Sequence, residues 1–138
     1  MPKTPRFVLA LDVGEKRIGV ALASTVARIA SPLTTLANDE SFIGRLLELI
    51  AENDIETLVV GLPRGLDGQD TAQTRYVRKF VEDLQAQIGM PLHMQDEAVT
   101  SAKAEAELHA RGRAYTKENI DSLSATYILE DYLQGGAA

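Results

Sequence analysis

Residues 7–24 read FVLALDVGEKRIGVALAS and contain two apolar runs that are separated by a short polar turn. The first run, residues 7–11, is continuously apolar, as expected of a central strand that is buried on both faces. It is followed by Asp12 and then by the polar turn Glu15-Lys16-Arg17, and residues 18–23 form the second run. This pattern predicts a β-hairpin, and the apolar first strand places it within a sheet.

Outward from the hairpin, the hydrophobic pattern predicts one more strand and then an alternation of helices and strands. The expected elements are a strand over 26–36, a helix around 42–50, a strand over 55–61, a helix around 76–84, a strand over 91–95, a helix from residue 100 or 101 to 112, and a helix over 116–133. Pro32 favours an edge position for the first of these strands. Hairpin-linked strands followed by crossovers through helices predict an α/β fold, a mixed five-stranded sheet with helices on both faces.

Length and composition limit the classes of protein. A chain of 138 residues fits one domain, and we expect residues 1–5 and 135–138 to be disordered tails. The net charge of −6 argues against a general nucleic-acid coat protein, although residues 1–36 carry +3 and residues 63–80 carry +2. There is no cysteine and no apolar run of membrane-spanning length, so the sequence predicts a cytoplasmic protein without a membrane partner.

Three acids occupy positions where a charge is costly for the fold. Asp12 follows a buried strand, Glu97 closes another strand, and Asp121 shares the core-facing row of the last helix with Ala125 and Ile128. Asp12 could be a turn residue and Glu97 a helix N-terminal acid, but a shared divalent cation explains all three acids together. Mg²⁺ and Mn²⁺ prefer carboxylate oxygens, and two such ions can bind the attacking and leaving oxygens in phosphodiester hydrolysis.

Positive charge lies near these acids in loops at strand ends. Lys16 and Arg17 follow Asp12, and Arg64 follows the strand that ends at Gly61. Cations at such positions are candidates for contacts to phosphate groups, whereas cations on the exposed face of a helix are ordinarily solvated. We therefore expect Lys16, Arg17 and Arg64 to bind the backbone of a nucleic acid.

The motifs now described resemble those of the YqgF (RuvX) family, in the same order and over nearly the whole chain. The matching segments are LDVGEKRIGVA at 11–21, VVGLP at 59–63, Asp67-Gly68, Asp96-Glu97, Ile120-Asp121, Ile128-Leu129 and Tyr132-Leu133. The first of these segments is specific, whereas the Asp-Glu pair alone is not. The chain departs from the family at Ala98, where members usually have Arg, and this departure bears on substrate contacts more than on metal binding.

The resemblance implies a ribonuclease H-like fold and a nuclease that matures the 5′ end of pre-16S ribosomal RNA. It also implies that Asp12, Glu97 and Asp121 are the catalytic, metal-binding acids, with Mg²⁺ or Mn²⁺ as the cofactor. The expected partner is structured RNA or branched DNA, and a homodimer is left open.

Three other functions are compatible with the sequence. The family is related to Holliday-junction resolvases, so a four-way DNA junction is an alternative substrate. A non-catalytic module that binds nucleic acid in association with ribosomes or transcription is a second alternative. The hairpin turn also resembles the phosphate-binding turn of actin-like ATPases, but those proteins need two such domains and 138 residues supply one.

Overall fold

The computed structural model describes residues 6–97 and 117–135, and its five strands form one sheet in the order β3-β2-β1-β4-β5. The strands are β1 (Phe7–Val13), β2 (Arg17–Ser24), β3 (Ser31–Ala37), β4 (Ile55–Pro63) and β5 (Leu92–Glu97). The helices are α1 (Phe42–Glu52), α2 (Ala72–Gln87) and α4 (Lys117–Gly135). Strand β1 is central, antiparallel to β2 and parallel to β4, and β4 is parallel to β5. The sheet is therefore mixed and five-stranded, as predicted.

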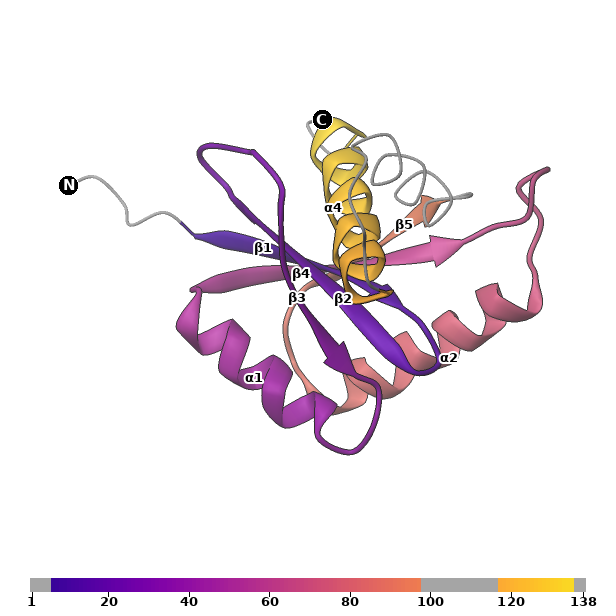
Figure 1. Ribbon diagram of the computed structural model, residues 1–138, viewed down its shortest axis with the longest axis horizontal. Coiled ribbons are helices and arrows are strands. Elements are labelled where there is room, and N and C mark those ends of the chain that lie inside the picture. The colour runs from indigo at the N-terminus through magenta and orange to yellow at the C-terminus, as the bar shows by residue number, and fades with distance from the viewer. Residues whose placement is uncertain (1–5, 98–116, 136–138) are drawn as a thin grey trace.

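The two faces of the sheet are covered by different helices (Figure 1). Leu9 and Leu11 of β1 face α1 and α2 in one core, whereas Val8 and Ala10 face α4 in the other. The face toward α4 is built from small residues, which allows the helix backbone to approach the strands closely. A Cβ atom at Gly19 of β2 would lie 1.9 Å from the carbonyl oxygen of Asp121. Helix α4 is consequently seated directly on β2.

Strand β3 is an edge strand, as Pro32 predicts, but it is shorter than the predicted strand over 26–36. Residues 25–30 instead form a turn and its continuation, so that β3 begins at Ser31. Arg28 adopts a positive φ of 56°, and its amide donates to the carbonyl of Ser24 at 2.9 Å. A left-handed residue cannot continue a pleated strand, and this turn is the reason for the late start of β3.

The predicted helices agree with the structure in position and differ in length. Helix α2 begins at Ala72 because Thr71 and Thr74 form a reciprocal capping box, which the apolar pattern alone did not reveal. Helix α4 continues through Gly135, so this residue does not belong to the predicted C-terminal tail. The helix expected to end at residue 112 lies outside the described residues. In the described part of the chain, no helix is long and apolar enough to cross a membrane.

Candidate functional site

The carboxyl ends of β1, β4 and β5 lie at one edge of the sheet because the three strands are parallel. Asp12 is next to last in β1, and Glu97 is the last residue of β5, in register with Pro63 of β4. Residues in register on neighbouring strands share a face, and side chains alternate along a strand. Asp12 therefore lies on the same face as Ala10, and Glu97 on the same face as Gly61, whose absent Cβ leaves room for α4. Both acids project from the face of the sheet that α4 covers.

Asp121 reaches this edge from α4 and lies close to Asp12. Asp12 is paired with Gly19 in the hairpin, and the backbone of Asp121 packs on Gly19. Burial, and secondly the negative charge of Asp121, raises the pKa of Asp12 from the ordinary value of 3.8 to about 7. The structure thus brings together two of the three predicted acids, and ionisation of Asp12 is disfavoured by desolvation and, to a smaller extent, by the charge of Asp121.

Arg17 compensates part of the negative charge of Asp121. Its Nε donates a hydrogen bond of 2.8 Å to Oδ2 of Asp121, and both side chains are half-buried. The predicted phosphate-binding residue Arg17 is therefore in contact with a predicted metal ligand. A cation that is bonded to a ligand carboxylate in this way fixes the orientation of that carboxylate.

Glu97 lies at the same edge, with one carboxyl oxygen shielded from solvent. Its backbone carbonyl accepts a 2.8 Å hydrogen bond from the amide of Arg64, which joins β5 to the end of β4. Within the described residues, no three side chains of His, Asp or Glu are close enough to form a ready-made metal cluster. The three acids lie on the same side of the sheet, at the carboxyl ends of the parallel strands. Their only ligand atoms are carboxylate oxygens, which are the ligands that Mg²⁺ and Mn²⁺ prefer.

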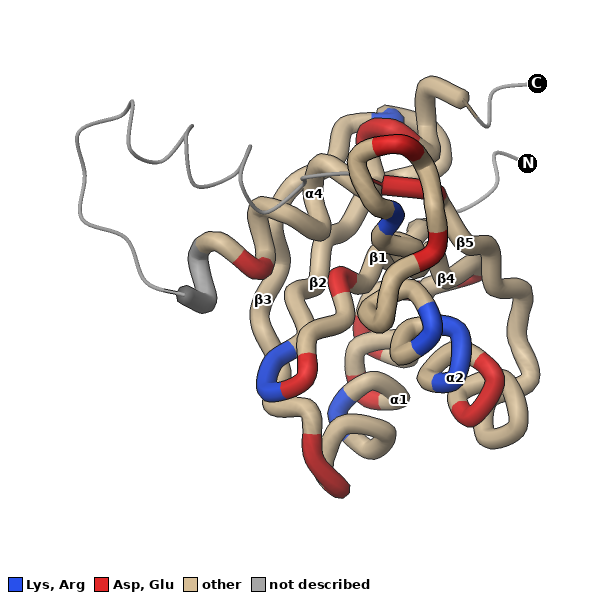
Figure 2. Tube along the Cα trace, turned by 90° about the vertical axis from the view of Figure 1, so that its right-hand side faces the viewer, with Lys and Arg blue, Asp and Glu red and all other residues tan. Residues whose placement is uncertain are grey.

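The other two predicted phosphate contacts differ in their surroundings. Arg64 donates to Asp96 at 3.2 Å and also contacts Oδ1 of Asp70, whose other carboxyl oxygen Arg78 contacts. Lys16 is exposed in the turn between β1 and β2 and has no ion pair in the described part of the chain. Figure 2 faces the loop that follows β4 and shows acidic and basic residues interspersed there and along the start of α2. Of the three predicted contacts, Lys16 is the one whose charge is available to a ligand without exchange of partners.

Two residues that the sequence analysis did not single out support the end of β1. Asn38 donates through Nδ2 to the carbonyl of Gly14 at 2.8 Å and to the hydroxyl of Tyr76 at 3.1 Å. Gln73 donates through Nε2 to the carbonyl of Val13 at 3.3 Å. They come from the β3–α1 connection and from α2, and neither residue type nor spacing in the sequence indicates these contacts.

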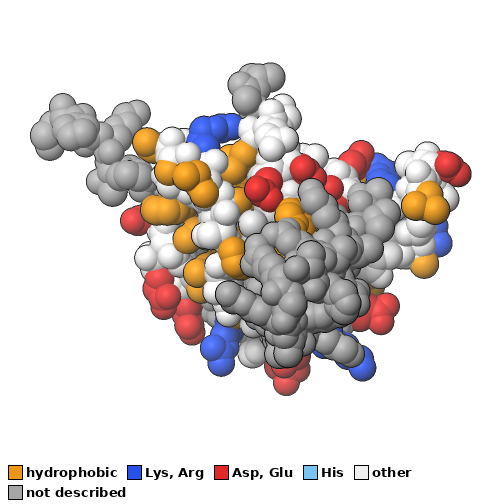
Figure 3. Space-filling view, turned by 45° about the horizontal axis from the view of Figure 1, so that its top comes forward, with side chains coloured by type: hydrophobic (Ala, Val, Ile, Leu, Met, Phe, Trp, Pro, Cys, Tyr) orange, Lys and Arg blue, Asp and Glu red, His pale blue; other side chains and the backbone are white. Residues whose placement is uncertain are grey.

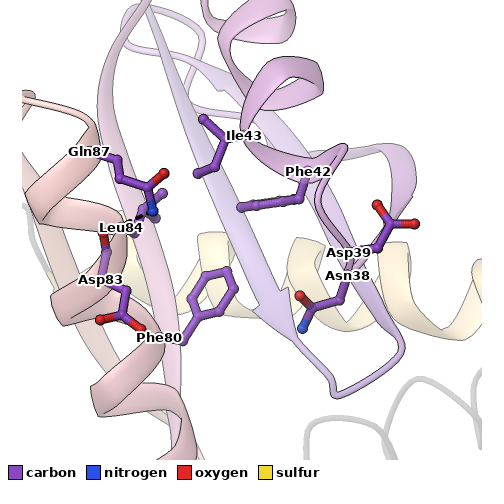
Figure 4. A pocket seen from close by; sticks show the side chains of 8 residues that line it. All are labelled: Asn38, Asp39, Phe42, Ile43, Phe80, Asp83, Leu84 and Gln87. Atoms are coloured by element: carbon purple, nitrogen blue, oxygen red, sulfur yellow. Dashed lines mark hydrogen bonds between the residues drawn. The ribbon is translucent and has the colours of Figure 1, made fainter.

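A pocket of about 190 Å³ lies away from the acids, between α1 and α2 (Figure 4). The rings of Phe42 and Phe80 line it with their centroids 5.5 Å apart and their planes tilted by 55°, and Asp83 and Gln87 border it from α2. Phe42 and Phe80 belong to the core on the face opposite α4. The sheet therefore separates this pocket from Asp12, Glu97 and Asp121, which lie on the face that α4 covers.

Comparison with known proteins identifies the family. The family model described as "RuvX: Holliday junction resolvase" matches residues 6–135. The chain belongs to the RuvX family. A RuvX relative from Chloroflexus aggregans is 43% identical over 130 residues, which are 91% of this chain and 92% of the relative. One from Moorella thermoacetica is 41% identical over 133 residues, 91% of this chain and 93% of the relative. Each is named "Putative pre-16S rRNA nuclease".

Solved structures confirm the ribonuclease H-like fold of this RuvX chain. The structure titled "T. thermophilus RuvC in complex with Holliday junction substrate" matches with a TM-score of 0.54 at 15% identity, covering 96% of this chain and 98% of that one. A second Thermus thermophilus RuvC structure matches with a TM-score of 0.52 over the same shares. At this identity the likeness concerns the fold, whereas the nuclease names come from the sequence relatives.

Proposed function

We propose that this RuvX-family chain is a metal-dependent nuclease that processes the 5′ end of pre-16S ribosomal RNA. The observation that carries the proposal is the meeting of Asp12 and Asp121 at the carboxyl ends of the parallel strands, where Glu97 ends β5 on the same face of the sheet. The pKa of about 7 for Asp12 supports it, because a divalent cation compensates two neighbouring carboxylates better than one arginine does. The names of the sequence relatives support the choice of substrate.

In this proposal, Asp12, Glu97 and Asp121 hold Mg²⁺ or Mn²⁺, and two ions fit the chemistry. Bound ions of this kind supply an activated water and stabilise the leaving oxygen of the phosphodiester. Arg17 orients the carboxylate of Asp121, and Asn38 and Gln73 hold the end of β1 in place. Lys16, Arg17 and Arg64 contact phosphates of the substrate. Arg17 does so through the guanidinium nitrogens that do not bind Asp121, and Arg64 by exchange with its present carboxylate partners.

The experiment that tests this function measures both the metal requirement and the chemistry of the ends. A 5′-extended precursor RNA should be cleaved in Mg²⁺ or Mn²⁺, and cleavage should stop in EDTA. Direct attack by water should leave a 5′-phosphate and a 3′-hydroxyl, as in related nucleases. Undiminished cleavage in EDTA, or a 2′,3′-cyclic phosphate product, would contradict the proposal.

Phosphate contacts should appear in the salt dependence of RNA binding. Lys16→Ala should flatten the slope of log affinity against log salt by about 0.7–0.9, because one released counterion is lost. Arg64→Ala should have a smaller effect, since Asp70 and Asp96 already neutralise that charge. Fluorescence anisotropy between about 50 and 200 mM salt measures the slope. Lys79→Ala is the control, because Lys79 lies on α2 and is paired with Asp83. If the salt slope is unchanged in the Lys16, Arg17 and Arg64 variants, the nucleic acid binds to another face of the protein.

A second candidate function is cleavage of four-way DNA junctions. The description of the family as a Holliday junction resolvase favours it. A four-way junction, a precursor RNA and ATP offered in the same assay separate resolvase, ribonuclease and actin-like ATPase activity. Binding without any cleavage would favour the non-catalytic module. The homodimer and the location in the cytoplasm stay predictions.

A further inference from the structure

The loop between β4 and α2, residues 64–71, carries an apolar side chain that has no role in the core. Leu66 is 88% exposed, the highest value among the large apolar side chains of the described residues. Leaving a leucine side chain in water is less favourable than burying it. Leu66 makes no contribution to the core, and its side chain is open to contact with a partner.

The β4–α2 loop is held in one conformation by its own hydrogen bonds. The amide of Gly65 donates to the carbonyl of Gln69 at 2.8 Å, and the amide of Gly68 donates to the carbonyl of Gly65 at 2.9 Å. Gln69 also accepts through Oε1 from the amide of Asp67 at 2.9 Å, and Gly68 has a φ of +79°. Leu66 is therefore presented by an ordered loop, which reduces the entropy lost when its side chain is buried by a ligand.

The base of the loop is fixed by charged residues. Asp70 lies between Arg64 and Arg78, and the hydrogen bond from Arg78 lowers the pKa of Asp70, which keeps it ionised. Arg64 is paired with Asp70 and Asp96, and Arg78 is paired with Asp70, so both arginines at the base of the loop already have acidic partners. Simple attraction between the loop and a phosphate is therefore weak, and the apolar tip is its main distinguishing feature.

The β4–α2 loop lies next to Glu97 at the carboxyl ends of the parallel strands. It starts after Pro63, which is in register with Glu97, and the amide of Arg64 donates to the carbonyl of Glu97. The loop projects beyond the end of the sheet at the right of Figure 1, and hydrophobic side chains are exposed on the corresponding projection at the right of Figure 3. A substrate that reaches Glu97 from this side passes the tip of the loop.

We propose that Leu66 packs against an unstacked base of the substrate, at the border between duplex and single strand. This inference rests on the proposed nuclease function and specifies the form of its substrate. Apolar side chains insert between bases where stacking is interrupted, whereas a continuous duplex keeps the faces of its bases covered. Leu66 thus selects interrupted duplex, and the acids act on the phosphate backbone beside it.

The test uses an RNA hairpin with a single-stranded extension, a 2-aminopurine at the first unpaired position, and EDTA to prevent cleavage. Leu66→Ala should weaken binding to this RNA about tenfold, the loss expected for one buried leucine side chain. It should also remove the change in 2-aminopurine fluorescence. Leu66→Met should retain both signals, because it conserves the apolar volume. Binding to a continuous duplex of equal length should be nearly unchanged in all variants.

Ile29→Ala is the matched control. Ile29 is 74% exposed and lies in the connection between β2 and β3, at the opposite edge of the sheet. If Leu66→Ala and Ile29→Ala bind the extended hairpin equally well, the inference is wrong. If Leu66→Ala weakens duplex and extended hairpin to the same degree, the proposed selectivity is wrong. If the parent protein binds neither RNA, the proposed ribonuclease function is wrong and the inference fails with it. Binding to a four-way DNA junction, included as a third ligand, would then favour the resolvase function.

Discussion

Replacement of Asp12 by Asn is expected to reduce metal-dependent cleavage about 1000-fold, which corresponds to the loss of several kcal/mol of transition-state stabilisation. The reason is that Asp12 lies half-buried near the end of the central strand, paired with Gly19 and beside Asp121. Asn keeps the size of the side chain but removes the charge that, in the proposed function, binds the cation. Single-turnover cleavage of precursor RNA at saturating enzyme measures the loss at the chemical step.

Asp54→Asn is the control for this substitution. Asp54 is exposed and lies just before β4, at the edge of the sheet opposite the acids. Its replacement should leave the cleavage rate unchanged. A rate for Asp12→Asn within about threefold of the control would remove Asp12 from the catalytic group.

Replacement of Gly19 by Ala is expected to disrupt both the fold and the site. Its Cβ would lie 1.9 Å from the carbonyl oxygen of Asp121 and 2.9 Å from the amide nitrogen of Ser122. These are backbone atoms, so α4 must move, and we expect a loss of about 3 kcal/mol or more in the free energy of unfolding. The same movement separates Asp121 from Asp12 and Arg17. Urea unfolding measures the loss of stability.

Gly44→Ala is the matched control, because a Cβ at Gly44 of α1 meets no atom within 4 Å. Replacing a helical glycine by alanine at an open position should stabilise the protein by about 0.5–1 kcal/mol. Equal stability of the Gly19→Ala variant and the parent would show that α4 is not seated on β2 as described.

The sequence was sufficient to predict the order of the described elements because their hydrophobic patterns are strong. The continuous apolar run before Asp12 indicates a strand that is buried on both faces, and the helical spacing around Phe42 and Leu46 indicates α1. Local backbone geometry was not predictable in this way. The positive φ of Arg28 moves the start of β3 to Ser31, and no residue type in that stretch indicates it.

The candidate site was predicted in part. An acid on the apolar row of a helix is unusual enough to identify Asp121, and strand ends identify Asp12 and Glu97. The ion pair between Arg17 and Asp121 joins residues 104 positions apart, so spacing cannot reveal it. Arg64 was predicted as a phosphate contact from its loop position, whereas its contacts with Asp70 and Asp96 depend on how the loop folds. The exposure of Leu66 was likewise not predictable, because it depends on how the loop folds.

The measurement that tests the shared metal site most directly is a set of thermal melts at pH 8, each with EDTA or with Mn²⁺. The proteins are the parent and the Asp12→Asn, Glu97→Gln and Asp121→Asn variants. An acid whose pKa is raised by folding contributes stability below its unfolded pKa of 3.8, and that stability is lost as the pH rises through about 7. At pH 8, ionised Asp12 therefore costs the metal-free parent up to about 4 kcal/mol.

In EDTA, Asp12→Asn should accordingly melt no lower than the parent. Asp121→Asn removes only the smaller, electrostatic part of this cost and also removes the partner of Arg17, so its melt in EDTA should stay close to that of the parent. Mn²⁺ should raise the melting temperature of the parent by binding to the native state, and all three variants should lose most of that rise. If all three variants instead melt lower in EDTA and keep the parent's full response to Mn²⁺, the acids serve the fold and do not share a metal site.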